Sequence, residues 1–308
     1  MLIISDLDNF QPPWNQAVIC LGDFDGIHLG HRKLIQKVIR KSSNLLKPVL
    51  VTYDPSPKKV LSRLKTDSNI YTREEKIIIL QSFNLFAAIF VPFNIEMSRF
   101  SAKYFLKNIL IDKLKASHII LGYDHQFGRN RHGNYKYVKM AEKKYHHTTE
   151  QIKSFRYGGA PISSTRIRIL LKKGEIKKAN KQLGSPFLIM GTVIRGRQRG
   201  RKFGIPTANL HIPPEKLIPR EGVYFCIAQY GSHTYKAVVN IGFNPTFANV
   251  DLSIEAHLLN FHFTIYGETL KLFFHDKIRD EIKFESIDSL KKQILKDIAY
   301  AKSKTVKL

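Results

Sequence analysis

Cysteine, acidic residues and long apolar runs are all scarce in this chain of 308 residues. The two cysteines, Cys20 and Cys226, lie within apolar runs, so we expect buried free thiols and a cytoplasmic location. The best candidate for a membrane span, Leu85 to Val91, stops at Pro92 and falls well short of the roughly 18–20 residues that a bilayer requires. The first residues have no basic region ahead of their apolar side chains, so we also expect no signal peptide.

The shortage of acidic residues leaves a net charge of +25 at pH 7. Such a charge fits a nucleic-acid-binding protein, or a lysine-rich chain with a phosphate-rich substrate. The lysines are spread over helix-like segments, as at Lys172-Lys173 and Lys291-Lys292, which favours the second interpretation. The basic loop from Arg195 to Lys202 also lacks the interleaved aromatic residues on which bases stack. We therefore expect no nucleic-acid partner.

The stretch from Gly22 to His31, GDFDGIHLGH, is the one around which the first half is organised. It follows the apolar run Ala17 to Leu21, which predicts a buried strand, and precedes apolar residues at helical spacing. A strand-to-helix turn with three glycines lets the backbone approach a bound group, and a helix N-terminus suits phosphate. His28 and His31 can share one side of the first helical turn and stabilise charge on a reacting phosphate. The alternative is a polar loop with two surface histidines.

Strand and helix patterns alternate through the rest of this half, with strand-like runs at 48–53, 87–91 and 117–121. Helical patterns at 72–83 and 98–110 lie between them, which predicts a doubly wound parallel sheet of the α/β class. Ligands bind such sheets at the carboxyl ends of the strands. Gly122 and Asp124 follow the last of these runs, and Asp124 either hydrogen-bonds an adenine or ribose or is a turn residue.

A second candidate anion site begins at Ser163-Ser164-Thr165. Hydroxyl groups there can cap the helix that follows, and Arg166 or Arg168 can add charge-assisted hydrogen bonds to an anion. An ordinary capped helix with exposed arginines is the other interpretation.

The pattern changes in the second half, after a predicted linker at Gln182 to Pro186. Short strand-like runs at 187–194, 223–229, 235–239, 252–259 and 269–274 predict a small antiparallel β-barrel, followed by a helix at about 286–301. We therefore expect two domains, residues 1–184 and residues 185–308.

Three segments of the barrel half offer chemistry, although the chain has no Walker A sequence. The first runs from Gly191 to Asn209, where glycines and arginines can surround phosphates and Thr207 and Asn209 offer the hard oxygen ligands that Mg²⁺ accepts. The second is Asn240 to Phe247, whose turn residues and aromatic side chains can either line a pocket for a planar ring or pack as an ordinary loop. In the third, Glu255 can accept a proton from a hydroxyl or simply face outward from a strand.

Taken together, these motifs resemble the bacterial bifunctional riboflavin kinase/FAD synthetase family. The turn at 22–31 is similar to the H-x-G-H signature of nucleotidyltransferases, and 162–168 is similar to the Ile-Ser-Ser-Thr-x-x-Arg motif. The second half is similar to the flavokinase pattern of Gly-x-Val-x-x-Gly, Pro-Thr-Ala-Asn, Asn-Ile-Gly-x-x-Pro-Thr-Phe and Glu-x-His. The resemblance covers nearly the whole chain in order. It implies an FMN adenylyltransferase domain followed by a riboflavin kinase domain, with ATP, riboflavin and FMN as substrates and Mg²⁺ as cofactor.

The resemblance also implies residue roles. The catalytic residues would be His28, His31 and Glu255. ATP in the adenylyltransferase site would contact Gly22, Asp23, Phe24, Gly30, Gly122, Asp124, Ser163, Ser164, Thr165 and Arg168. ATP in the kinase site would contact Gly191, Val193, Gly196, Gly204 and Thr207. The flavin would contact Asn240, Gly242, Pro245, Thr246 and Arg279, and Mg²⁺ would bind Thr207 and Asn209.

Three positions depart from the family pattern. Ser56 stands where a histidine is common between the prolines, and His125 replaces a common phenylalanine after Asp124. Both lie in the expected adenylyltransferase pocket. Asn260 replaces a common aspartate and leaves Glu255 intact.

Two alternatives remain. One is a nucleic-acid-binding protein that uses the charge of +25 and the loop from Arg195 to Lys202. The other is an adenylyltransferase or cytidylyltransferase for a different phosphate acceptor, and the motifs of the second half count against it.

Overall fold

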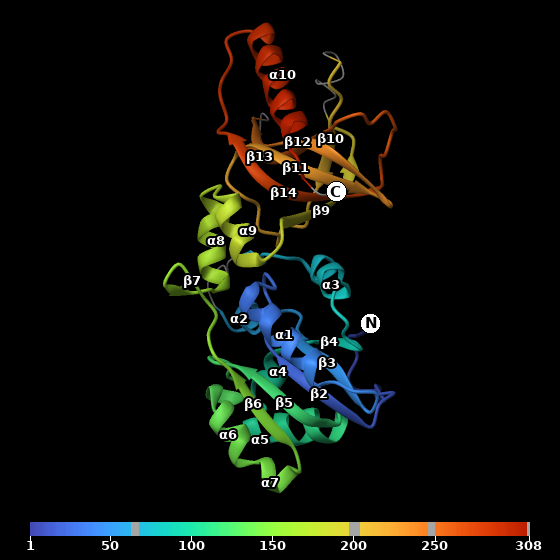
Figure 1. Ribbon diagram of the computed structural model, residues 1–308, viewed down its shortest axis with the longest axis vertical. Helices are drawn as coiled ribbons and strands as arrows, with labels where there is room; N and C mark the ends of the chain where they lie inside the picture. Colours follow the sequence, from blue (N-terminus) through green and yellow to red (C-terminus); the bar gives the residue numbers. More distant parts are fainter. Residues whose placement is uncertain (63–67, 197–203, 246–249, 307–308) are drawn as a thin grey trace. The chain divides into compact units, whose positions relative to one another are not determined.

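The computed structural model describes residues 1–62, 68–196, 204–245 and 250–306. These residues divide into two compact units, and each is described by itself (Figure 1). The first unit comprises Met1–Asp67 and Lys76–Ser163, and the second comprises Ser68–Glu75 and Ser164–Leu308. A short segment from the first half of the sequence, Ser68–Glu75, therefore belongs to the second unit.

The first unit is built on a parallel sheet of six strands. They are β1 (Leu2–Ile4), β2 (Gln16–Leu21), β3 (Leu46–Tyr53), β4 (Ala87–Val91), β5 (Ala116–Gly122) and β6 (Thr148–Ile152). Their order is β1-β4-β3-β2-β5-β6, and every neighbouring pair is parallel. The chain moves outward from β2 through β3 and β4 and then returns to place β5 beside β2. This reversal makes the carboxyl ends of β2 and β5 the switch point, where ligands bind such sheets.

Helices and short pieces accompany this sheet. They are α1 (Leu29–Lys41), α2 (Pro57–Leu61), α3 (Arg73–Gln81), α4 (Ile95–Ser98), α5 (Ala102–Tyr104), the π-helix η1 (Phe105–Lys113), η2 (Arg129–Arg131), α6 (Tyr135–Met140), α7 (Glu142–Tyr145), β7 (Arg156–Tyr157) and β8 (Ala160–Pro161). The prediction of one helix over 98–110 was wrong. Ser101 accepts a hydrogen bond from the Tyr104 N–H at 3.1 Å and starts a new helix there, which continues as a π-helix to Lys113.

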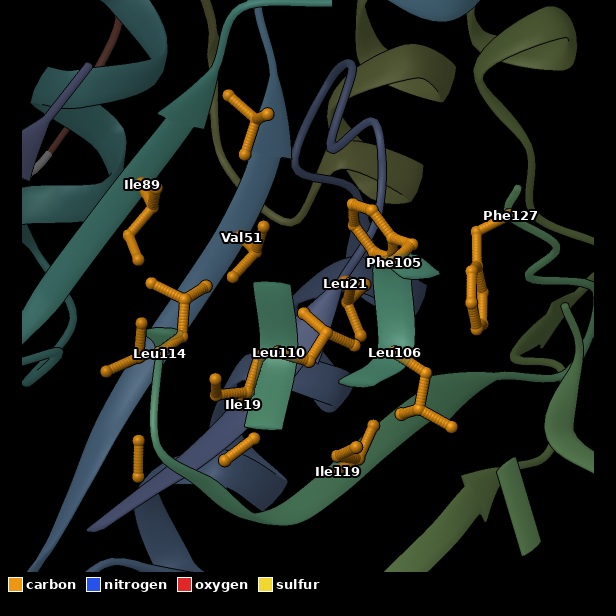
Figure 2. Close-up of a cluster of buried hydrophobic side chains, with 14 of the residues drawn as sticks. Ile19, Leu21, Val51, Ile89, Phe105, Leu106, Leu110, Leu114, Ile119 and Phe127 are labelled. Atoms are coloured by element: carbon orange, nitrogen blue, oxygen red, sulfur yellow. The ribbon is translucent and has the colours of Figure 1, made fainter. Parts of the chain in front are cut away.

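Both faces of the sheet are apolar, because successive strand residues point to opposite sides. Ile19 and Leu21 belong to one core cluster, with Leu106 and Leu110 of η1, whereas Val18 and Cys20 belong to another with the apolar residues of α1. Figure 2 shows the first cluster, in which η1 side chains face Ile19 and Ile119 of the sheet. The doubly wound parallel sheet that the sequence predicts is confirmed.

The second unit contains a closed barrel of six strands. They are β9 (Phe187–Ile194), β10 (Ala208–His211), β11 (Gly222–Tyr230), β12 (His233–Pro245), β13 (Val250–Leu258) and β14 (Thr269–Arg279). Every neighbouring pair in the order β10-β13-β12-β11-β14-β9 is antiparallel, and β9 closes on β10. The helices of this unit are α8 (Ser164–Lys172), α9 (Ile176–Leu183) and α10 (Ile287–Ser303). The predicted barrel and final helix are confirmed.

Two details of the second half differ from the sequence prediction. Gln182 and Leu183 end helix α9 instead of forming a linker, since both are buried and Gly184 closes the helix at a φ of +76°. The stretch from Asn240 to Pro245 continues strand β12, paired residue by residue with β13, instead of forming a turn. No helix in the described ranges is both long and apolar enough to cross a bilayer.

Candidate active sites

The turn between β2 and α1 is organised by His28, which is the N-cap residue of α1. Its Nδ1 accepts a hydrogen bond from the His31 N–H at 3.3 Å, and the two imidazole rings stack with centroids 3.7 Å apart. Because Nδ1 is an acceptor, the proton of the neutral ring lies on Nε2 and can be donated to a ligand. Only 7% of His28 is exposed.

Both histidines are neutral at pH 7. Burial lowers the pKa of His28 to about 4. The pKa of His31 also lies well below its usual value, because burial, the neighbouring imidazole of His28 and the ammonium group of Lys76 all disfavour a positive charge on this ring. The Nδ1 atom of His31 is buried, with no hydrogen-bond partner among the described residues. The pair therefore offers hydrogen bonds in place of permanent charge, although a bound anion would favour the protonated form and raise both pKa values.

The backbone of this turn is strained. Phe24 and Ile27 have φ angles of +48° and +39°, a region that side chains rarely adopt. Such strain concentrates at functional sites. Gly30 makes room for the histidine ring, because a Cβ there would lie 3.1 Å from His28 Cε1. Gly22 makes room for the buried Phe24 ring in the same way. These two glycines therefore permit side-chain packing within the turn.

Lys76 was missed in the sequence analysis. It lies in α3, is only 6% exposed, and donates from Nζ to the Asp23 carbonyl at 3.1 Å. The Thr52 hydroxyl donates to the same carbonyl at 3.0 Å. A lysine near the start of a helix usually faces solvent, so nothing in the local sequence indicates burial beside the histidines.

The carboxyl end of β5 lies at the same sheet edge, because Leu121 of β5 pairs with Leu21 of β2. Gly122 ends β5, and Asp124 is exposed beyond it. Burial lowers the pKa of His125 to about 4, and its Nε2 has no partner within the described part of the chain. Ser56 precedes α2 and makes no capping hydrogen bond with its side chain.

The second candidate anion segment is divided between the units. Ser163 is the last residue of the first unit, the one that contains the two histidines. Ser164, Thr165 and Arg168 belong to the second unit, at the start of α8. Arg168 Nε donates to the Ser68 carbonyl at 3.1 Å, so this arginine also binds the segment Ser68–Glu75.

In the barrel, the ladder of strands gathers a polar cluster around Glu255. Glu255 of β13 lies opposite Asn209 of β10 on one side and Asn240 of β12 on the other. The Thr207 hydroxyl donates to Glu255 Oε2 at 3.3 Å. His257 Nδ1 donates to the Pro206 carbonyl at 2.8 Å and so fixes the turn that presents Thr207.

This oxygen set fits a magnesium ion. Mg²⁺ usually binds one or two protein side chains, with phosphate oxygens and waters completing its octahedral shell. Thr207 and Asn209 carry side-chain oxygens that could take this part, and the carboxylate of Glu255 lies beside them. No cluster of three His, Cys, Asp or Glu side chains suited to a metal occurs in the described ranges. Two neutral side-chain oxygens are too few to hold Mg²⁺ by themselves, so this set fits a metal that is also bound by nucleotide phosphates.

The predicted phosphate-binding glycines differ in their surroundings. A Cβ at Gly196 would lie 2.2 Å from Asn209 Nδ2, so glycine there lets the loop approach the polar cluster. Gly191 is packed against His211 within the barrel, beside the buried Val193. Gly204 has a φ of +73° and open space around it.

The predicted flavin-binding residues follow β12 and β14. Gly242 packs so closely on the Glu281 carboxylate that a Cβ would lie 1.8 Å from Oε1. Arg279 donates from Nε and from one terminal nitrogen to Asp297 Oδ2, at 3.0 and 2.9 Å, and Asp297 is only 2% exposed. Pro245 ends β12, and Thr246 lies outside the described residues.

Comparisons with known proteins agree with this division into two sites. A FAD synthetase family model matches residues 10–166, and a riboflavin kinase family model matches residues 183–305. The bifunctional riboflavin kinase/FMN adenylyltransferase of Buchnera aphidicola subsp. Schizaphis graminum is 37% identical, over 98% of each chain. The protein of the same name from Escherichia coli is 31% identical, over 96% of each chain.

A solved structure from Streptococcus pneumoniae, described as a macrolide-efflux protein, has a TM-score of 0.89 and 29% identity. It covers 99% of this chain and 100% of its own, so the two folds agree over their full length. The family models occur in the same order as the two sites, and the curated relatives extend over both. The chain therefore belongs to the family of bifunctional riboflavin kinase/FMN adenylyltransferases.

Proposed function

We propose a division of labour between the two sites. As a member of its family, the protein is a transferase that phosphorylates riboflavin with ATP to give FMN, and then transfers AMP from a second ATP to FMN to give FAD and pyrophosphate. We assign the first reaction to residues 185–308 and the second to residues 1–184. The observation that carries this assignment is a difference in chemistry: the barrel site has the carboxylate of Glu255, whereas the sheet site has two imidazoles.

In the barrel, a neutral hydroxyl of the riboflavin side chain must lose its proton as its oxygen attacks the γ-phosphate of ATP. Glu255 accepts that proton, while the bond between the γ-phosphate and ADP breaks. Thr207 and Asn209 would hold Mg²⁺, which would neutralise charge on the phosphate oxygens. We assign the ATP phosphates to the backbone at Gly191 to Gly196 and at Gly204, and the flavin to Asn240, Gly242, Pro245, Thr246 and Arg279.

On the parallel sheet, the attacking group is the phosphate of FMN, which is already an anion and needs no base. Its oxygen attacks the α-phosphate of ATP, and pyrophosphate leaves. His28 and His31 donate hydrogen bonds to the phosphate oxygens as their charge grows. We assign further ATP contacts to Gly22, Asp23, Phe24, Gly30, Gly122, Asp124, Ser163, Ser164, Thr165 and Arg168.

We further propose that the protein works in the cytoplasm. Both cysteines, Cys20 and Cys226, are buried free thiols, which suits a reducing compartment. The substrates we propose, ATP and riboflavin, are small molecules, and the assignment needs no macromolecular partner.

A chromatographic assay tests this function. Purified protein would be incubated with riboflavin, ATP and Mg²⁺, and FMN and FAD would be followed over time. We expect FMN to appear first and FAD after it. Formation of FMN without FAD would mean that the sheet site is inactive, and Ser56 and His125, which depart from the family pattern, would be substituted first. No conversion of riboflavin, and none of FMN supplied directly, would contradict the proposed function.

A further inference from the structure

Lys76 is a buried cation beside the H-x-G-H turn. Its Nζ donates to the Asp23 carbonyl, and in the described part of the chain it forms no ion pair. The two carboxylates of the turn, Asp23 and Asp25, make other contacts. An ammonium group has three N–H donors, so one backbone carbonyl leaves most of its hydrogen-bonding capacity unused.

A buried charge without a counter-ion is unfavourable, because the cost of removing it from water is several kcal/mol and a single hydrogen bond to a carbonyl offsets only part of it. Buried charges in proteins are therefore normally paired or bind a ligand. A bound anion would supply the missing counter-charge at Lys76. The burial of Lys76 therefore favours a bound anion at this turn, and this argument does not depend on the H-x-G-H motif.

The neighbours of Lys76 also favour an anion. The positive charge of Lys76 is close enough to help lower the pKa of His31, and the Nδ1 of His31 is buried without a partner among the described residues. The N-terminus of α1, a helix of 13 residues, begins at the same turn and adds its partial positive charge. Two carboxylates, those of Asp23 and Asp25, also belong to this turn, and their negative charges oppose an anion, so the cations and donors named above must outweigh them.

We propose that Lys76 binds a phosphate group of the nucleotide at the H-x-G-H turn and supplies the permanent positive charge of that site. This inference rests on the proposed function, and it names a residue that the sequence motifs do not contain. His28 and His31 then act as donors placed around a phosphate whose charge Lys76 balances. The ligand class is a di- or triphosphate, that is, ATP before the reaction and pyrophosphate after it.

Three substitutions separate the charge of Lys76 from its hydrogen bond. Lys76→Gln removes the charge and keeps a donor for the Asp23 carbonyl, Lys76→Met removes both, and Lys76→Arg keeps the charge. Lys107→Met is the matched control, because Lys107 is an exposed lysine of the same unit that pairs with Asp112. Binding of inorganic pyrophosphate to each full-length protein would be measured by calorimetry, with FAD formation from supplied FMN measured in parallel.

We expect Lys76→Gln to weaken pyrophosphate binding about tenfold or more, in line with the loss of one charge-assisted contact. The same variant should raise the KM for ATP in FAD formation by a similar factor and leave the KM for ATP in FMN formation unchanged. Lys76→Arg should stay within a few fold of the unmodified protein, and Lys107→Met should match it. The salt dependence of pyrophosphate binding should also be shallower in Lys76→Gln.

A folded Lys76→Gln protein that binds pyrophosphate as tightly as the unmodified one would overturn the inference. Lys76 would then only tether the Asp23 carbonyl, while continued FAD formation would leave the proposed function intact. If the unmodified protein makes no FAD from FMN, the proposed function fails and the inference fails with it. Should Lys76→Met not fold, the comparison of Lys76→Gln with Lys76→Arg still decides the question.

Discussion

Lys76 and Lys216 are both buried, yet their surroundings differ. In the second unit, Lys216 Nζ has Glu75 Oε2 and the carbonyl oxygens of Ile70 and Leu188 at 2.6 Å each. In the first unit, Lys76 has one carbonyl oxygen at 3.1 Å and forms no ion pair among the described residues. Glu75 and Lys76 are neighbours in α3 but belong to different units. The buried charge of Lys216 is balanced within its own chain and stabilises the fold, whereas the incomplete set of partners around Lys76 is the basis for proposing a ligand there.

The two candidate sites also differ in the charge and the hydrogen-bonding groups that they offer. The sheet site offers hydrogen-bond donors and a positive charge, in His28, His31 and Lys76. The barrel site offers oxygen acceptors, in Glu255 and its neighbour Thr207. A nucleophile that is already an anion needs donors around it, and a neutral hydroxyl needs a base. The chemistry of each site therefore matches the nucleophile that we assign to it.

The largest effect should come from Glu255→Gln, which removes the base and keeps the size of the side chain. General bases contribute about 10²–10⁴-fold in rate, so FMN formation should fall by that factor. FAD formation from supplied FMN should not change. Chromatography of flavins from both assays measures this, and Glu285→Gln, at an exposed position of the same unit, is the control. Unchanged FMN formation would show that another group accepts the proton.

The next largest effect concerns stability. Lys216→Met leaves Glu75 as a buried carboxylate without its cation, which costs about 3–5 kcal/mol in comparable buried pairs. The second unit should unfold at lower temperature, as followed by loss of FMN formation. Lys178→Met breaks only an exposed pair with Glu175 and should cost about 0–1 kcal/mol. An equal, small effect of both substitutions would mean that the Lys216 pair contributes little.

His31→Ala removes one donor from the sheet site. Loss of one such donor typically costs about 10²–10³-fold in rate. We expect FAD formation to fall by that factor and FMN formation to stay unchanged, with each assayed separately. Because the His31 ring stacks on His28, circular dichroism of the variant should accompany the assay. Equal loss of both activities would refute the division of labour.

The regular elements were largely predictable from the sequence, because they depend on local patterns. The runs at 87–91 and 187–194 became strands β4 and β9 with the predicted bounds. Alternation of strand and helix patterns was enough for the parallel sheet, and closely spaced strands were enough for the barrel. The π-helix η1 was not predictable, because apolar residues at helical spacing do not distinguish it from an α-helix.

Long-range packing explains the other omissions. The segment Ser68–Glu75 follows the pattern of the first half, yet Glu75 accepts hydrogen bonds from the Met190 N–H and from Lys216, far along the chain. Local periodicity carries no information about which unit a segment joins. The same limit applies to Lys76, whose burial depends on the turn after β2, and to Arg279, which pairs with Asp297 on another element. The Glu255 cluster was partly predictable, because each member lies in a recognisable motif.

The smallest expected effect is a difference between the two units in how their free energy of unfolding depends on pH. The folded pKa of His28 is about 4, against 6.5 when unfolded, so its contribution to the free energy of unfolding is complete above pH 6.5 and is lost as the pH falls from 6.5 to 4. This loss is on the order of 3 kcal/mol, and His125, with the same direction and value, adds to it. Both histidines are in the first unit, which also contains Trp14, the single tryptophan of the chain.

Trp14 is buried, so its fluorescence reports the unfolding of the first unit. We expect its urea midpoint to fall between pH 7 and pH 4.5 more steeply than the midpoint for loss of FMN formation, which reports the second unit. His125→Phe removes one titrating group and places an apolar ring in a half-buried position, so it should flatten the Trp14 response. If His125→Phe leaves the pH dependence of the Trp14 urea midpoint unchanged, the neutral form of His125 does not make the first unit sensitive to acid. The two units would then differ less in their buried titratable groups than we propose.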